Sequence, residues 1–166
     1  DLSGEIYYYN NIPRELKDLF PLFVDYDVNN KWYKIEKIKG LTVSNMYLSE
    51  LLTIDNLTHI MNSIKRIQST KIKNSDSNIN IYSNYCDKMK SRKNNYNYNS
   101  FNNFDNEFKN IFNILEEYEN NQKGKQVIIH GDPVLTNILI NNFGKIKFID
   151  MRGKIGNIST IYGDYL

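Results

Sequence analysis

The chain of 166 residues carries a formal net charge of +2, with 40% hydrophobic and 24% charged residues. These values are ordinary for one globular domain with its own core, and the small net charge does not indicate a polyanionic partner. A single cysteine, Cys86, excludes an internal disulfide, and together with only two histidines it argues against a Cys/His zinc site. No apolar run approaches the roughly 18 residues of a membrane span, and the first residues do not form a secretory signal. We therefore expect an intracellular, cytoplasmic protein without membrane contact.

The first 38 residues are predicted to form a helix and then two strands. Apolar side chains recur at helical spacing over residues 5–20, where Pro13 is expected to break or restart the helix. Residues 22–27 alternate apolar and polar side chains as a strand does, and residues 31–38 are predicted as a second strand after a short turn.

The middle of the chain is predicted to be helical, with polar loops. Ser44 is expected to cap a short helix through Leu52, and Asp55 or Asn56 a longer helix through Gln68.

The composition turns strongly polar from residue 71 to residue 106. We expect a loop over residues 71–80 and helices over residues 81–93 and 101–118, the second with an apolar face.

Three short apolar strands are predicted near the end, over residues 125–130, 137–141 and 145–150. The tight turn at residues 142–144 makes the second and third strands a hairpin. With the helices before them, the chain follows an α+β pattern.

Polar side chains gather around these strands. His130, Asp132 and Asn137 lie in or beside the loop between the first two strands, and Asp150 ends the third strand. Because the hairpin brings Asn137 and Asp150 to the same end, we expect two carboxylates and one carboxamide to meet at one edge of a sheet. Such oxygen ligands suit Mg²⁺, which binds a few protein oxygens together with substrate phosphates. The alternative is a fortuitous turn in which Asp and Asn serve only as turn-forming residues.

The pattern His-Gly-Asp-x-x-x-x-Asn at residues 130–137 precedes a strand pair that ends in Phe-Ile-Asp. It resembles the catalytic and metal-binding loops of protein-kinase-like small-molecule kinases, in particular the aminoglycoside phosphotransferases and the choline/ethanolamine kinases. The resemblance implies that Asp132 is the catalytic base and that His130 shapes the loop. It also implies that Asn137 and Asp150 hold Mg²⁺ against the phosphates of ATP.

Upstream, the resemblance is less specific. The helix with Glu5 resembles the helix that carries the ion-pairing Glu of this family, although Glu5 is equally well explained as a solvated acid at a helix start. Residues 33–45 resemble the strand and hinge between the two lobes, which implies that backbone groups of Glu36, Lys37 and Ile38 meet the adenine. For the side chain of Glu36 we favour an exposed strand position.

The implied fold is protein-kinase-like. Residues 1–38 would be the remnant of an N-terminal lobe, with two strands and a helix. Residues 39–166 would be an incomplete, mostly helical C-terminal lobe that holds the small catalytic β unit, and residues 71–106 would be a polar, Asn-rich insert or helix–loop region. No glycine-rich phosphate loop and no strand lysine precede Glu5, so we expect truncation at both ends and leave open whether the fragment alone is active.

The implied function is ATP-dependent phosphoryl transfer to a hydroxyl of a small molecule, such as a sugar, an amino alcohol or an aminoglycoside-like compound, with a role in cell-surface polysaccharide metabolism as a further expectation. The missing lysine and glycine-rich loop keep open a non-catalytic kinase-like binding or scaffold domain. Arg152, two residues after Asp150, is either a contact to an anionic acceptor or phosphate oxygen, or a member of a structural ion pair.

Residues 65–93 combine many Lys and Arg residues with interleaved tyrosines, a pattern that can bind single-stranded nucleic acid. Because the whole chain is close to neutral, we favour a solvated helix face and do not expect a nucleic-acid partner.

Overall fold

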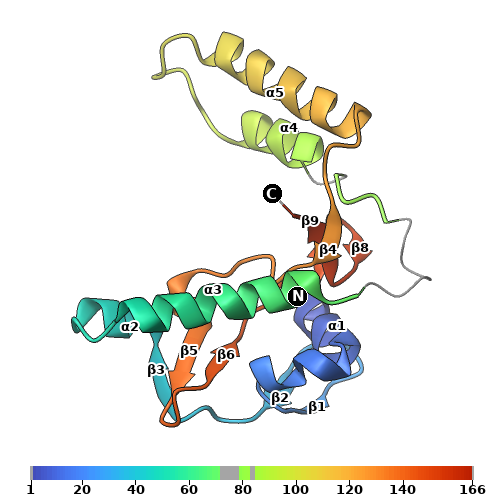
Figure 1. Cartoon of the computed structure of the whole chain (residues 1–166). Helices are drawn as coiled ribbons and strands as arrows, with labels where there is room; N and C mark the ends of the chain where they lie inside the picture. The colour runs from blue at the N-terminus through green and yellow to red at the C-terminus, as the bar shows by residue number, and fades with distance from the viewer. Residues whose placement is uncertain (1, 72–78, 83–84, 166) are drawn as a thin grey trace.

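The computed structural model describes residues 2–71, 79–82 and 85–165, and it confirms the α+β prediction. Within these residues the strands pair antiparallel, in one three-stranded sheet and several two-stranded ones, and the helices lie between and around them (Figure 1). Within the same residues, no helix has the length and apolar character needed to cross a bilayer.

The N-terminal elements follow the predicted order. Helix α1 (Ser3–Asn11) ends before Pro13, and a 3₁₀ helix, η1 (Arg14–Leu19), follows it. Strands β1 (Phe23–Tyr26) and β2 (Tyr33–Ile35) then pair antiparallel. The break at Pro13 is therefore confirmed, because the chain restarts as a tighter helix after it.

The next segment corrects the predicted caps. A strand that the sequence did not predict, β3 (Gly40–Thr42), leads directly into α2 (Val43–Leu48). Thr42, and not Ser44, caps α2, since its hydroxyl accepts a hydrogen bond from the Asn45 backbone at 3.1 Å.

The cap of helix α3 (Ile54–Ser69) is Thr53, which lies before both predicted cap residues, Asp55 and Asn56. Thr53 and Asn56 form a reciprocal capping box, in which each side chain bonds the backbone N–H of the other. Asn56 is thus part of the cap but not the cap residue itself, and Asp55 lies in the first turn.

The C-terminal strands form as predicted but do not share one sheet. Strands β5 (Ile138–Asn141) and β6 (Ile146–Phe148) make the predicted hairpin, with Gly144 in the left-handed region at φ 74°. Strand β3 adds to the free edge of β5, whereas β4 (Gln126–Ile128) pairs with β9 (Tyr162–Asp164).

Neither β9 nor the short pair β7 (Lys154–Ile155) and β8 (Ile158–Ser159) is predicted from the sequence, because two- and three-residue strands carry too little periodicity. The expectation of a single sheet edge is therefore wrong. The loop that follows β4 connects two sheets.

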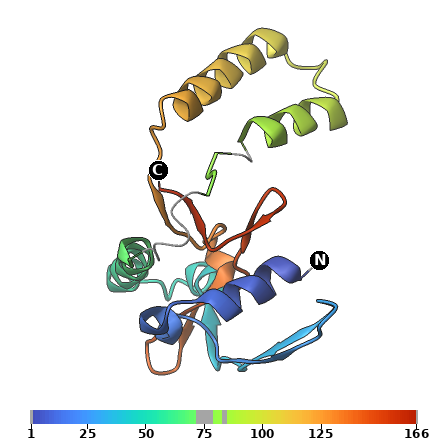
Figure 2. The same cartoon turned by 90° about the vertical axis from the view of Figure 1, so that its right-hand side faces the viewer.

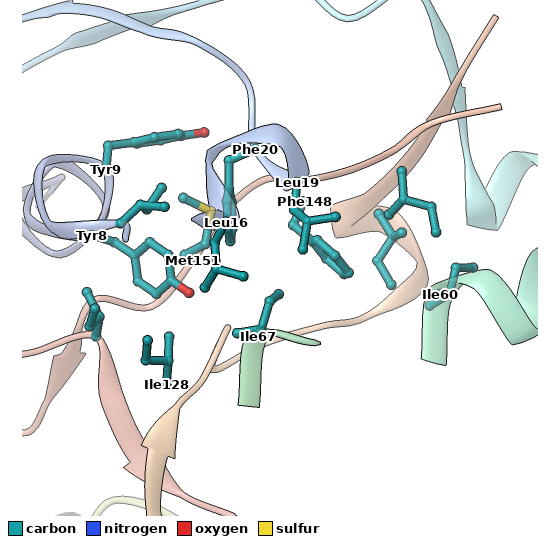
Figure 3. Close-up of a cluster of buried hydrophobic side chains, with 14 of the residues drawn as sticks. Tyr8, Tyr9, Leu16, Leu19, Phe20, Ile60, Ile67, Ile128, Phe148 and Met151 are labelled. Atoms are coloured by element: carbon teal, nitrogen blue, oxygen red, sulfur yellow. The ribbon is translucent and has the colours of Figure 1, made fainter. Parts of the chain in front are cut away.

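The core lies between α1, η1, α3 and the β5–β6 hairpin (Figure 3). Phe148 and Leu16 are fully buried, and Phe148 packs against Phe20 with ring centroids 6.1 Å apart. Ile67 of α3 and Ile128 of β4 close the cluster on the other side, so one core supports both sheets that flank the loop.

Helices α4 (Tyr85–Asn95) and α5 (Phe104–Asn120) form a hairpin that projects from the rest of the chain (Figures 1 and 2). Both begin later than predicted: Ile81 and Tyr82 are buried in a turn, and Asn103 is in the left-handed region directly before α5. Most of the loop predicted over residues 71–80 lies outside the described residues.

The α4–α5 hairpin has no buried residue in either helix. Its inner side is aromatic and basic: Tyr98 stacks on Phe104 with centroids 4.3 Å apart, and the Lys93 ammonium lies 4.4 Å from the centre of the Phe108 ring. Contacts of this kind join the helices without a sealed core.

Candidate functional site

The loop at residues 130–137 is closed by its own hydrogen bonds. The carbonyl of Asp132 accepts from the Val134 N–H at 2.9 Å and from the Asn137 side-chain amide at 3.1 Å. Gly131 takes φ 86°, a left-handed conformation that glycine adopts without strain. The backbone of this loop is therefore pinned, while the side chain of Asp132 faces solvent.

Asp150 is held beside this loop by backbone pairing. The Ile149 N–H donates to the Asn137 carbonyl at 3.0 Å, one step beyond the last pair of the β5–β6 hairpin. Asp150 is exposed and has φ 60°, a strained value for a residue that is not glycine. The chain thus turns sharply at Asp150. The hydrogen bond between Ile149 and Asn137 confirms the prediction that Asn137 and Asp150 lie at the same end of the hairpin.

The donor set of Asn137 and Asp150 fits Mg²⁺ better than it fits zinc. The Asn137 amide nitrogen is used by the Asp132 carbonyl, and its oxygen receives only a long contact of 3.3 Å from the Thr136 hydroxyl. Within the described residues no three His, Cys, Asp or Glu side chains cluster as a metal site. A carboxylate and a carboxamide are a small set, which is what Mg²⁺ uses when phosphates complete its shell.

His130 is buried under the loop and is neutral at physiological pH. Its Nδ1 accepts from the Asp132 N–H at 3.3 Å, and its ring packs against Phe148 with centroids 5.5 Å apart. Burial lowers the pKa of His130 to about 4, while a backbone contact to Ile149 and the charges of Asp132 and Asp150 act in the opposite direction. Nε2 has no partner with full hydrogen-bond geometry in the described residues, so the Ile149 contact is a weak one. The charges of both exposed carboxylates, Asp132 and Asp150, therefore raise the pKa of the same buried imidazole ring.

Helix α1 lies directly against the segment after Asp150. A Cβ at Gly4 would collide with the Arg152 carbonyl, and a Cβ at Gly153, which has φ 59°, would collide with the Gly4 carbonyl. This close approach of two backbones requires glycine at both positions.

Glu5 follows Gly4 and accepts a hydrogen bond from the Tyr33 hydroxyl. Burial raises the pKa of Tyr9, and the charges of Glu5 and Asp150 raise it further, so both carboxylates lie near the Tyr9 ring. Glu5 is thus on the Asp150 side of α1, and its partner in the described residues is a tyrosine rather than a lysine.

The predicted adenine contacts, residues 36–38, lie between β2 and β3. Glu36 continues the β1–β2 pairing: its N–H donates to the Leu22 carbonyl at 2.8 Å and its carboxylate accepts from the Leu22 N–H at 3.1 Å. Its side chain is exposed, as favoured, and Glu36 lies directly after the last residue of β2.

Lys37 and Ile38 lie in the link between β2 and β3, and this link ends where the Lys39 carbonyl accepts from the Asn142 N–H at 3.1 Å. Asn137 precedes β5 and Asn142 follows it, so the link that contains Lys37 and Ile38 meets β5 at the end away from Asn137.

A cavity of about 290 Å³ opens beside the loop. Gly131 and Pro133, the two neighbours of Asp132, line it, as do Arg152 and Tyr85. This size suits a small ligand. Sequence reasoning missed Tyr85, because one tyrosine among 13 carries no distinguishing signal.

Asp164 anchors the far side of this cavity. Its carboxylate accepts from the Tyr118 hydroxyl at 2.7 Å, from the Tyr85 hydroxyl at 3.3 Å and from the Lys125 N–H at 3.1 Å. One carboxylate thus connects β9, both helices of the α4–α5 hairpin and the strand before the loop.

Comparison of the chain with models of known protein families, with curated proteins and with solved structures gives no match. The candidate site is therefore supported by its geometry and by its residue types.

Proposed function

We propose that this chain is the catalytic portion of a protein-kinase-like small-molecule phosphotransferase, which moves the γ-phosphoryl group of ATP to a hydroxyl. The observation that carries the proposal is a pair of hydrogen bonds: the Asn137 side-chain amide donates to the Asp132 carbonyl, and the N–H of Ile149, the residue before Asp150, donates to the Asn137 carbonyl. These bonds fix the backbone of Asp132 and of the segment before Asp150 relative to Asn137, and phosphoryl transfer needs a base and metal ligands at fixed separation.

In this proposal, each residue of the candidate site has a separate role in phosphoryl transfer. Asp132, exposed on a pinned loop, would orient the acceptor hydroxyl and take its proton. Asn137 and Asp150 would hold Mg²⁺, which when bound supplies charge neutralisation at the phosphates. His130 would keep the loop in shape as a neutral, buried ring.

The division into a partial N-terminal lobe, residues 1–38, and a C-terminal lobe, residues 39–166, belongs to the same proposal. So do a cytoplasmic location and a role in the metabolism of cell-surface sugars. Helix α1 packs against Gly153, so residues of the first part contact the segment after Asp150.

One observation favours the non-catalytic alternative. Glu5 is hydrogen-bonded to the Tyr33 hydroxyl, and a kinase-like Glu in an active arrangement pairs with a lysine instead. A binding or scaffold domain would keep the loop geometry without binding nucleotide.

The test distinguishes the proposed role of Asp132 as catalytic base from that of Asp150 as metal ligand. Calorimetry of the chain with Mg²⁺ and ATP, followed by phosphoryl transfer to a panel of sugars and amino alcohols, should give binding and turnover. Asp150→Asn should abolish Mg²⁺-dependent nucleotide binding, whereas Asp132→Asn should retain binding and lose turnover by about 10²–10⁴-fold. Asp55→Asn, an exposed carboxylate on α3, is the matched control and should change neither. Absence of Mg²⁺-dependent nucleotide binding in the unmodified chain would favour the scaffold alternative.

A further inference from the structure

The surroundings of Asp132 are basic. Arg152 is held next to the loop by its N–H, which donates to the His130 carbonyl at 3.0 Å. Its side chain lies over Gly131, since a Cβ at Gly131 would be 2.6 Å from the Arg152 Cβ. Arg152 is exposed and lines the cavity that opens beside Asp132.

Helix α4 adds two more cations from the other side. Tyr85, at the start of α4, lines the same cavity as Arg152, and it also lines the neighbouring groove together with Lys88 and Arg92. Desolvation lowers the pKa of Lys88, and the charges of Arg152 and Arg92 lower it further, while Asp132 raises it. Lys88 therefore lies within electrostatic reach of both arginines and of the candidate base.

Within the described residues, none of these three cations makes an ion pair. Within residues 2–71, 79–82 and 85–165, the ion pairs involve Arg66, Lys93 and Lys123, and none involves Lys88, Arg92 or Arg152. Lys88 thus lies near both arginines and near the carboxylate of Asp132, and Asp164 lines the far side of the cavity, where it accepts hydrogen bonds from Tyr85 and Tyr118. The mutual repulsion of the three cations would be relieved by a bound anion, and two of them are arginines, which suit carboxylate and phosphate groups.

We propose that the acceptor of this phosphotransferase is itself anionic: a small molecule that carries a phosphate or carboxylate group, bound by Arg152, Lys88 and Arg92 with its hydroxyl at Asp132. The inference rests on the proposed function and selects among its substrates. A sugar phosphate or a sugar acid fits the cluster, whereas a cationic amino alcohol or aminoglycoside would be repelled by it.

The test is a binding titration of the chain with four probes of similar size: glucose 6-phosphate, glucuronate, glucose and glucosamine. We expect binding of one or both anionic sugars at least about 10-fold tighter than glucose, the gain expected from one charge-assisted hydrogen bond, and weaker binding still of glucosamine. The two anionic arms decide whether phosphate or carboxylate is preferred.

Variants tie the binding to the cluster. Arg152→Gln and Lys88→Gln should each weaken binding of the preferred anion by about 10-fold. Lys90→Gln is the matched control, because Lys90 is on the same helix but lies over the Phe112 ring of α5, and it should have no effect. Asp132→Asn should retain or increase anion binding, because it removes a negative charge near Lys88, even though turnover is lost.

Equal binding of glucose and glucose 6-phosphate, unchanged binding in Arg152→Gln, or binding of a single-stranded oligonucleotide without either anionic sugar would each overturn the inference. These outcomes are separable from failure of the proposed function. The proposed function fails if the unmodified chain shows no Mg²⁺-dependent ATP binding. The Arg152→Gln and Lys88→Gln variants are measured for binding of the anionic sugars and not for binding of ATP.

Discussion

The body that carries the candidate site and the α4–α5 hairpin are stabilised in different ways. The body, residues 2–71 and 121–165, contains all the residues of the main core cluster. The hairpin, which projects from the body in Figure 2, contains none of them, and its helices are joined by contacts of half-buried rings with lysine side chains. A site that needs fixed geometry is thus built on the rigid part, while the cations proposed to bind the acceptor come partly from the less tightly packed part.

The largest expected effect contrasts a core phenylalanine with a hairpin phenylalanine. Phe148→Ala removes a fully buried ring next to His130 and Phe20, and it should lower the free energy of unfolding by about 3–5 kcal/mol. Phe101→Ala, at a ring that is 64% exposed, should change it by less than about 0.5 kcal/mol. Urea denaturation measures both, and equal losses would mean that the hairpin shares the core.

The second effect is pH-dependent and belongs to the body. The pKa of His130 is about 4 in the folded chain, against an ordinary value of 6.5. Between pH 6.5 and pH 4, His130 is therefore protonated in the unfolded chain but neutral in the folded chain. Stability is therefore fully present above pH 6.5 and is lost as pH falls from 6.5 toward 4. The loss should reach about 2 kcal/mol between pH 7 and pH 5.

The two histidines of the chain provide the control for this effect. His130→Gln should remove this part of the pH dependence, measured by urea denaturation at both pH values, whereas His59→Gln, at an exposed position on α3, should leave it in place. An identical pH slope in both variants would contradict the neutral, buried state of His130.

The smallest effect concerns the connection between the two regions. Asp164→Asn weakens the hydrogen bonds from Tyr85, Tyr118 and the Lys125 N–H, and it should cost about 1–2 kcal/mol. The loss should show as faster amide hydrogen exchange in α4 and α5, with little change in β5 and β6. Asp105→Asn, an exposed carboxylate on α5 that pairs with Lys93, is the control and should be nearly silent. Equal acceleration of exchange in both regions would show that Asp164 supports the body rather than the connection.

Local signals determined much of the chain. Pro13 interrupts the first helix. The alternation in residues 22–27 and 31–38 produces paired strands, and the turn at residues 142–144 closes the β5–β6 hairpin. The proximity of Asn137 and Asp150 followed from that hairpin, because antiparallel pairing relates one strand's start to the other's end. Each of these features depends on residues close together in the sequence.

Only the tertiary structure decided the rest. The sequence could not show that β4 leaves the hairpin to pair with β9, that β3 joins β5, or that Glu5 meets Tyr33, because these contacts join segments far apart in the chain. The same holds for the charges near Asp132: Lys88 and Arg152 are distant in sequence, and the helix that carries Lys88 is connected to the body through hydrogen bonds of Tyr85 and Tyr118 to Asp164. Short-range patterns specify secondary structure and motifs, whereas the charge that surrounds a motif is set by packing between distant elements.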